Sequence, residues 1–188
     1  MKVLKFTLVL ISTVILISCG GSSDMHTADE KGFAAIEKEI KNKFGDHSYF
    51  TDLTITHNNS IGNIIGVTVT DAPESLKMGQ WNLTQGNWMQ NSEISLEVPE
   101  GSKAADFMFQ LNQKINLSTL GILAEKSSKQ LETEKNIKNP ILSIAYIKFP
   151  QNGDQAKTEY IVKLQPENGG ATFTFSYKLN GDFINLNY

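Results

Sequence analysis

ILSIAYIKFPQNGDQAKTEYIVKLQPENGGATFTFSYKLNGDFINLNY, residues 141–188, is the stretch that decides the fold class. Four runs rich in β-branched and aromatic residues are separated by asparagine and glycine, which permit the positive backbone angles that tight hairpins need. The runs cover residues 142–149, 158–164, 171–179 and 183–188, and the turns are Asn152-Gly153, Asn168-Gly169-Gly170 and Asn180-Gly181. This part of the chain is therefore predicted to form an antiparallel meander.

Two helical patterns stand upstream of strand-rich stretches. Residues 28–44 place Phe33, Ile36, Ile40 and Phe44 at steps of three and four, just before Gly45, so they predict an amphipathic helix. A second amphipathic helix is expected over residues 103–124, with an apolar stripe made by Phe107, Leu111, Ile115, Leu120 and Leu123. Residues 125–139 have helix-forming composition without a strong apolar face, and Pro140 limits any helix there.

The first half of the chain also contains strand signals after its helix, at residues 53–55, 61–69, 79–84 and 88–98. Placing residues 28–98 on residues 102–188 aligns Leu53-Thr54-Ile55 with Ile144-Ala145-Tyr146 and Trp88 with Phe183. This order indicates a degenerate tandem repeat of helix plus β-meander, although any α+β meander gives similar patterning. We predict one globular α+β domain over residues 28–188, with two amphipathic helices packed on a mainly antiparallel sheet.

Candidate core residues are Phe107, Leu111, Ile161, Phe173 and Phe175, and the last two share one face if their strand is regular. The predicted topology resembles the cystatin-like group, the PepSY-like secreted modules and, in its doubled form, the tandem β-lactamase-inhibitor proteins. The resemblance concerns topology alone, because no diagnostic motif of those families stands in the sequence. It implies a fold used for binding, and fold does not by itself imply function.

The amino terminus has the pattern of a secretion signal. Lys2 and Lys5 form a short positive region before an apolar run over residues 6–17. A helix that spans a bilayer needs about 20 apolar residues, so this run is too short for a comfortable permanent anchor. Residues 1–18 are therefore predicted to be a signal peptide that is removed.

Leu16-Ile17-Ser18-Cys19 resembles the lipobox of bacterial lipoproteins. That resemblance implies a diacylglycerol on the Cys19 thiol and cleavage before Cys19 by signal peptidase II. The alternatives are an ordinary signal peptide end or a chance thiol in an apolar stretch. The resemblance implies a place in the cell envelope, and because Gly20 is not the aspartate associated with inner-membrane retention, that place is the outer membrane if the cell is Gram-negative. Residues 19–27 then form a lipidated tether of flexible composition.

Composition excludes several partners and chemistries. All 17 basic residues are lysines, and removal of Lys2 and Lys5 leaves 15 against 20 acidic residues. An acidic chain without arginine is a poor candidate for nucleic-acid binding. Cys19 is the single cysteine, so the mature domain has no internal disulfide, cysteine metal cluster or thiol nucleophile. We predict no cofactor and no metal site.

No catalytic constellation is evident. His26, His47 and His57 fall in the tether, after a helix end and in a predicted turn, and their spacing fits no helical metal motif. Trp81 alternates with Leu83 and is expected in the core. Trp88 follows the Gly86-Asn87 turn at an expected rim, so it is the candidate for an interaction surface, although core packing is the more usual role of a tryptophan.

These features lead to a functional hypothesis without a named ligand. The chain is expected to be a membrane-anchored, non-enzymatic module that binds an envelope protein or a small ligand, held to the membrane by the lipid on Cys19. One alternative is an envelope inhibitor or immunity-type protein that presents its sheet to a secreted enzyme. Another is a hydrolase whose site has no recognisable motif.

Overall fold

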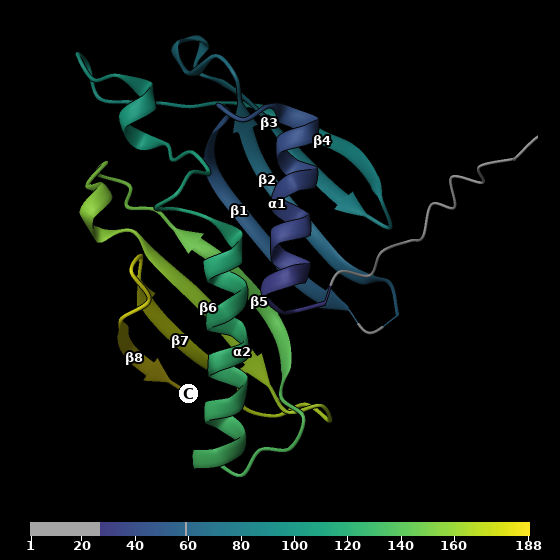
Figure 1. The fold of residues 1–188 in the computed structure, drawn as a ribbon. Coiled ribbons are helices and arrows are strands. Elements are labelled where there is room, and N and C mark those ends of the chain that lie inside the picture. The colour runs from purple at the N-terminus through teal and green to yellow at the C-terminus, as the bar shows by residue number, and fades with distance from the viewer. Residues whose placement is uncertain (1–26, 59) are drawn as a thin grey trace, which may run out of the picture.

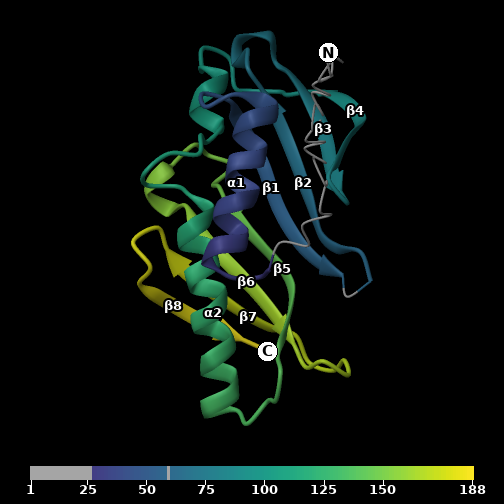
Figure 2. The same ribbon diagram turned by 45° about the vertical axis from the view of Figure 1, so that its right-hand side comes forward.

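The computed structural model describes residues 27–58 and 60–188. The predicted signal peptide, Cys19 and the tether up to residue 26 lie outside the described residues. Within them, eight antiparallel strands form one continuous sheet in the order β4-β3-β2-β1-β5-β6-β7-β8 (Figures 1 and 2). The strands are β1 (Tyr49–Asn58), β2 (Gly62–Thr70), β3 (Lys77–Thr84), β4 (Asn87–Ser95), β5 (Ile141–Lys148), β6 (Glu159–Gln165), β7 (Phe173–Lys178) and β8 (Phe183–Asn187).

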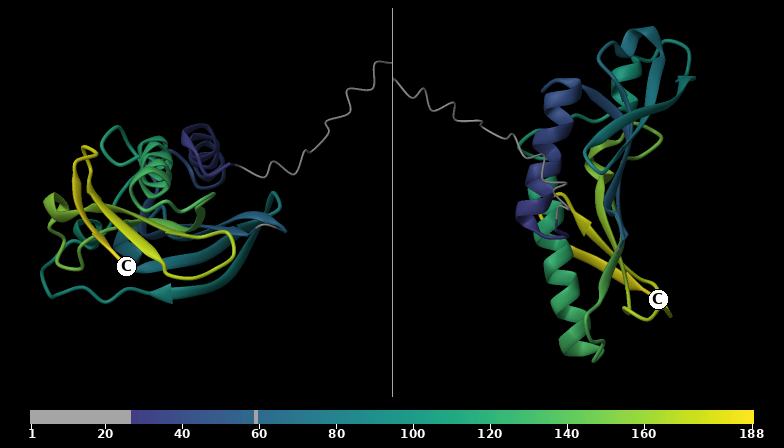
Figure 3. Two further views of the ribbon diagram at one scale, coloured as in Figure 1. Left: turned by 90° about the horizontal axis from the view of Figure 1, so that it is seen from below. Right: turned by 90° about the vertical axis from the view of Figure 1, so that its right-hand side faces the viewer.

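The predicted α+β architecture is confirmed. Helices α1 (Glu30–Phe44) and α2 (Leu117–Glu134) lie side by side on the same face of the sheet (Figure 3). Each helix is followed by four strands, and β1 pairs with β5 where the two halves meet. From the central β1–β5 pair, the strands therefore follow one another in chain order toward each edge of the sheet, β1 to β4 on one side and β5 to β8 on the other.

The second helix was predicted over residues 103–124, and that span is wrong. A short 3₁₀ turn, η2 (Ala104–Phe107), precedes an irregular segment, and α2 begins at Leu117. Asn112 explains the difference, because its side-chain oxygen accepts the backbone N–H groups of Lys114 and Ile115 and so offers an alternative to helix. Phe107 is only half-buried on η2, whereas Leu111 is buried from the irregular segment.

Both helices begin at side-chain caps. The Asp29 carboxylate accepts the Gly32 N–H at 2.8 Å, and the Asn116 side chain accepts the Thr119 N–H at 2.8 Å. These bonds satisfy donors that a helix amino terminus leaves without partners. The Asp29 bond also lowers the pKa of its carboxyl, because the N–H donors stabilise the ionised form.

The helices touch closely and are linked by polar contacts. A Cβ at Gly121 of α2 would stand 2.5 Å from the Asp29 carbonyl oxygen, so only glycine permits this approach. The Glu37 carboxylate of α1 accepts the Leu117 N–H at 2.7 Å, which places a negative charge at the amino terminus of α2. These contacts join the two helices to each other in addition to their packing on the sheet.

Tyr160 of β6 holds the start of α2 through hydrogen bonds to the backbone of Asn116. Its buried hydroxyl accepts the Asn116 N–H at 2.8 Å and lies 3.1 Å from the Asn116 carbonyl oxygen, to which it can donate. Burial, with a contribution from the Glu37 charge, raises the pKa of Tyr160 to about 12. The irregular connection that replaces the expected helix is thus tied to the sheet.

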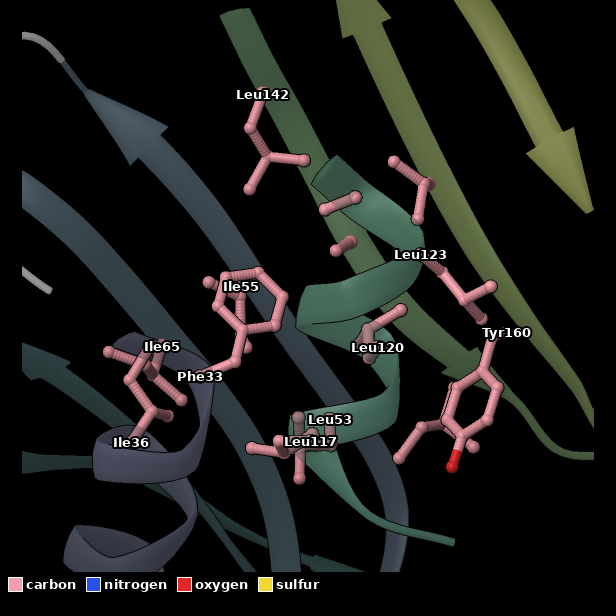
Figure 4. Packing of buried hydrophobic residues seen from close by; sticks show 14 of the residues in the cluster. Phe33, Ile36, Leu53, Ile55, Ile65, Leu117, Leu120, Leu123, Leu142 and Tyr160 are labelled. Atoms are coloured by element: carbon pink, nitrogen blue, oxygen red, sulfur yellow. The ribbon is translucent and has the colours of Figure 1, made fainter. Parts of the chain in front are cut away.

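The hydrophobic core lies between the helices and one face of the sheet. A single cross-strand row of this face extends over all eight strands and consists of Trp88, Leu83, Ile65, Ile55, Ala145, Val162, Phe175 and Leu186. All eight belong to the core cluster or pack against it. Figure 4 shows helix residues such as Phe33 and Leu120 pointing into the same layer as Ile55 and Ile65. Phe173 and Phe175 share this face, as expected.

Candidate functional site

The face of the sheet that points away from both helices is formed by residues that alternate with the core positions. Thr54, for example, stands between Leu53 and Ile55, which are fully buried in the core. Two cross-strand rows on this side extend over all eight strands, and we call their members the open face. The first row is Met89, Asn82, Gly66, Thr54, Tyr146, Ile161, Ser176 and Asn185. The second row is Asn87, Thr84, Ile64, Thr56, Ile144, Lys163, Thr174 and Asn187.

The open face has the composition of a contact surface. Lys163 is its one charged member, and the Lys163 Nζ lies 5.8 Å from the centre of the Tyr146 ring. Met89 is 64% exposed at one side, whereas Ile161 is only 3% exposed near the middle of the C-terminal half. Cores of protein interfaces are depleted of charge and enriched in tyrosine and methionine. The remaining members are mostly threonines and asparagines, which supply hydrogen-bonding groups.

Gly66 marks the middle of the N-terminal half of the open face. A Cβ there would lie 2.8 Å from the Thr54 Oγ1 and 3.5 Å from the Asn82 Oδ1, which also places these three residues on one side of the sheet. A glycine inside a strand leaves backbone uncovered and permits close approach of another chain. The Thr54 hydroxyl lies over Gly66, so at this point the open face presents side chains that can donate and accept hydrogen bonds.

The segment that links the two halves covers only one end of this side of the sheet. There Met78, Ala104 and Met108 form a second apolar cluster, against which residues such as Leu96 and Val98 pack. In the described residues, no helix lies over the two rows of the open face (Figure 3). Of the members of the two rows, Ile161 and Ser176 are buried, and the others are partly or fully exposed.

Trp88, the interaction candidate from the sequence, lies on the other side of the sheet. It is half-buried against the core cluster, and its ring meets Phe44 edge to face with centroids 4.9 Å apart. Trp81 contacts Phe44 in the same way at 5.6 Å and lies under the Lys43 ammonium at 4.7 Å. The Trp88 Nε1 is buried and has no hydrogen-bond partner among the described residues. Met89, one residue later, projects from the open face instead.

The described histidines do not come together. The His57 Nδ1 lies 2.8 Å from the Asn63 Oδ1, and the His47 carbonyl oxygen accepts a bond from the Gln110 side chain. His26 is outside the described residues. Across residues 27–58 and 60–188, no group of three or more histidine, cysteine, aspartate or glutamate side chains is placed to hold a metal ion.

The open face could not be recognised in the sequence, because it depends on which strands are neighbours. Alternation alone suggests that Tyr146 and Ile144 share a side of their strand. It does not reveal that Thr54 and Thr56 continue their rows on β1, more than 80 positions earlier in the chain. The non-local pairing of β1 with β5 creates the continuous surface.

Cys19 lies outside the described residues, and among those described no helix is both long and apolar enough to cross a membrane. Comparisons with protein-family models, with curated proteins and with solved structures find no match.

Proposed function

We propose that this chain is a lipid-anchored, non-enzymatic module of the bacterial cell envelope that binds a protein partner through the open face. The proposed anchor is Cys19, supported by the likeness of residues 16–19 to a lipobox and by the preceding apolar run. Acylation by more than one chain gives stable attachment, because each buried methylene contributes about 0.8 kcal/mol. The module then acts at a membrane surface, which is the outer membrane in a Gram-negative cell.

The open face is the observation that carries the binding proposal. Its two rows cross eight strands, which at roughly 4.8 Å between neighbours corresponds to about 34 Å. A surface of this width, with one charge and four accessible apolar side chains beside the buried Ile161, fits a folded protein better than a small ligand. The five apolar members are Ile64, Met89, Ile144, Tyr146 and Ile161.

Rigidity also favours this role. The core row lies directly behind the open face on the same strands, so the threonine and asparagine side chains are held by a packed sheet. A surface that is ordered before binding loses less conformational entropy when the partner docks. This rigid sheet therefore supports specific recognition without a mobile binding loop.

Purification from detergent-solubilised membranes tests the proposal. The wild-type chain is compared with Ile64→Lys, which adds a positive charge to the open face, and with Glu132→Lys, which makes a larger charge change of the same sign on the exposed side of α2. We expect one stoichiometric protein to accompany the wild-type chain and the Glu132 variant but to be lost from the Ile64 variant. Retention of that protein by a folded Ile64→Lys variant would refute the assignment of the surface.

A further inference from the structure

A hollow of about 400 Å³ lies beyond the two rows of the open face, at the end of β5, β6 and β7 where lysines collect. Its walls contain Lys148, Lys157 and Lys178, with Glu159 as the one acidic lining residue. Pro150 and Ile184 supply apolar surface. Small-molecule sites usually combine such apolar surface with a few polar groups that fix orientation, in volumes of roughly 300–1,000 Å³.

The residues that line the hollow include more lysines than carboxylates. Lys148 and Lys178 lie on either side of Glu159 in cross-strand register, and Glu159 binds Lys148 at 2.9 Å. Lys157 pairs with Asp154, outside the lining residues, at 3.1 Å. No ion pair joins Lys178 to a carboxylate within residues 27–58 and 60–188. Lys178 therefore has a positive charge available for a bound anion.

Thr158 has a buried hydroxyl group without a hydrogen-bond partner beside the hollow. The residue lines the hollow and is 3% exposed, and its Oγ1 has no hydrogen-bond partner in the described part of the chain. Buried hydroxyl groups are normally hydrogen-bonded, so an orphan of this kind indicates a missing partner. Because Oγ1 itself has less than 1 Å² of exposed surface, the hydroxyl is not open to a ligand in this structure, and the groups open to a ligand are the lysines and apolar side chains of the hollow.

Ile184 is directed to the hollow by an irregularity in the edge strand. Phe183 lies opposite Tyr177 and Asn185 lies opposite Ser176, so Ile184 is the extra residue of a β-bulge. Bulges commonly redirect a side chain beside a functional site. Ile184 is 39% exposed, and contact with the apolar part of a ligand would cover it.

We infer that this hollow binds a small molecule that joins an oxyanion, of the carboxylate or phosphate kind, to an apolar body. The oxyanion lies at Lys178 with Lys157 and Lys148 nearby, and the apolar body lies against Ile184 and Pro150. This inference does not rest on the proposed function, since none of its residues belongs to the two rows of the open face.

Methyl NMR of the full-length protein in amphipol, labelled at isoleucine, tests the site with benzoate, phenyl phosphate and uncharged benzamide. We expect at least one anion to shift the Ile184 methyl signals saturably while Ile122, 46% exposed on α2, stays unchanged. Which anion binds more tightly identifies the oxyanion. Lys178→Gln should weaken that binding by about two- to fivefold, the effect of one partly exposed charge pair.

Lys77→Gln is the matched control, since Lys77 is an exposed strand lysine that faces Glu93 at 3.4 Å far from the hollow in the sheet order. It should leave binding unchanged. The inference is overturned if neither anion moves Ile184, if Ile122 moves equally, if benzamide binds as tightly as the anions, or if Lys178→Gln has no effect. Each of these results leaves the proposed partner on the open face untouched.

Discussion

Ile55 of β1 lies directly opposite Ala145 of β5, at the centre of the eight-stranded sheet, and both side chains are fully buried. This pair joins the two halves of the chain into one core. The segments around them, residues 53–55 and 144–146, are the ones that the repeat alignment placed in equivalent positions. Equivalent strands thus meet at the centre, and the open face continues across the junction.

The central pairing predicts that neither half folds alone. A fragment of residues 102–188 would expose the edge of β5 and the part of the core that β1 and α1 cover. We expect this fragment to show no cooperative thermal transition, whereas a fragment that begins after Ser23 and contains both halves should melt cooperatively. Circular dichroism measures both, and a sharp transition of the 102–188 fragment would contradict the single core.

Gly121→Ala should destabilise the helix pair. The new methyl group would stand 2.5 Å from the Asp29 carbonyl oxygen, so the helices must separate. We expect a loss of about 1–3 kcal/mol in the free energy of unfolding, the usual cost of overpacking. Urea unfolding measures it, with Ser128→Ala on the same helix as the control. Equal stability of the two variants would show that α1 and α2 are not in close contact there.

Alkaline pH should weaken the fold through Tyr160. Because burial raises the pKa of Tyr160 to about 12 from an ordinary value of 10.0, the fold favours the neutral hydroxyl. Its contribution is complete below pH 10 and is lost as pH rises toward 12, by about 2–3 kcal/mol. Tyr160→Phe should be less stable at pH 8 but should lose less stability between pH 9 and pH 11.5. An equal loss in the free energy of unfolding of both proteins between pH 9 and pH 11.5 would contradict the assignment.

The sequence predicts the strands better than the helices, for a physical reason. Asparagine and glycine at turns such as Asn180-Gly181 act locally, so the hairpins are recognisable without tertiary information. The four-residue spacing of Phe107, Leu111 and Ile115 imitates a helix, yet Asn112 and the pairing of Phe109 with Phe50 hold that segment in another conformation. Residues 125–134 continue α2 although only Ser127 and Leu131 are buried there, which is why the apolar pattern of this part is weak.

The candidate sites were less predictable than the fold. Trp88 was the predicted interaction residue because tryptophan is common at interfaces. The strand register instead places Trp88 at the end of the core row and Met89 on the open face. The hollow at Lys178 gathers residues from β5, β6, β7 and β8 and the loops beside them, which are separate in the sequence. Both surfaces are products of strand order rather than of any local motif.

Cys19→Ser should abolish lipidation and leave the unprocessed precursor. The lipobox likeness of residues 16–19 requires the thiol as the acceptor of the lipid. Mass spectrometry of the membrane fraction should find the wild-type chain beginning at an acylated Cys19 and the variant retaining residues 1–18. An unmodified wild-type terminus, or one that begins elsewhere, would remove the proposed anchor.

Photo-cross-linking in cells tests most directly whether the open face binds a protein. A benzoylphenylalanine replaces Tyr146 in the middle of the open face, or Lys129 on the exposed side of α2 as the control. We predict a discrete cross-linked protein from position 146 on irradiation, lost when Ile64→Lys is added, and none from position 129. A partner captured from position 129 but not from position 146 would contradict the central claim.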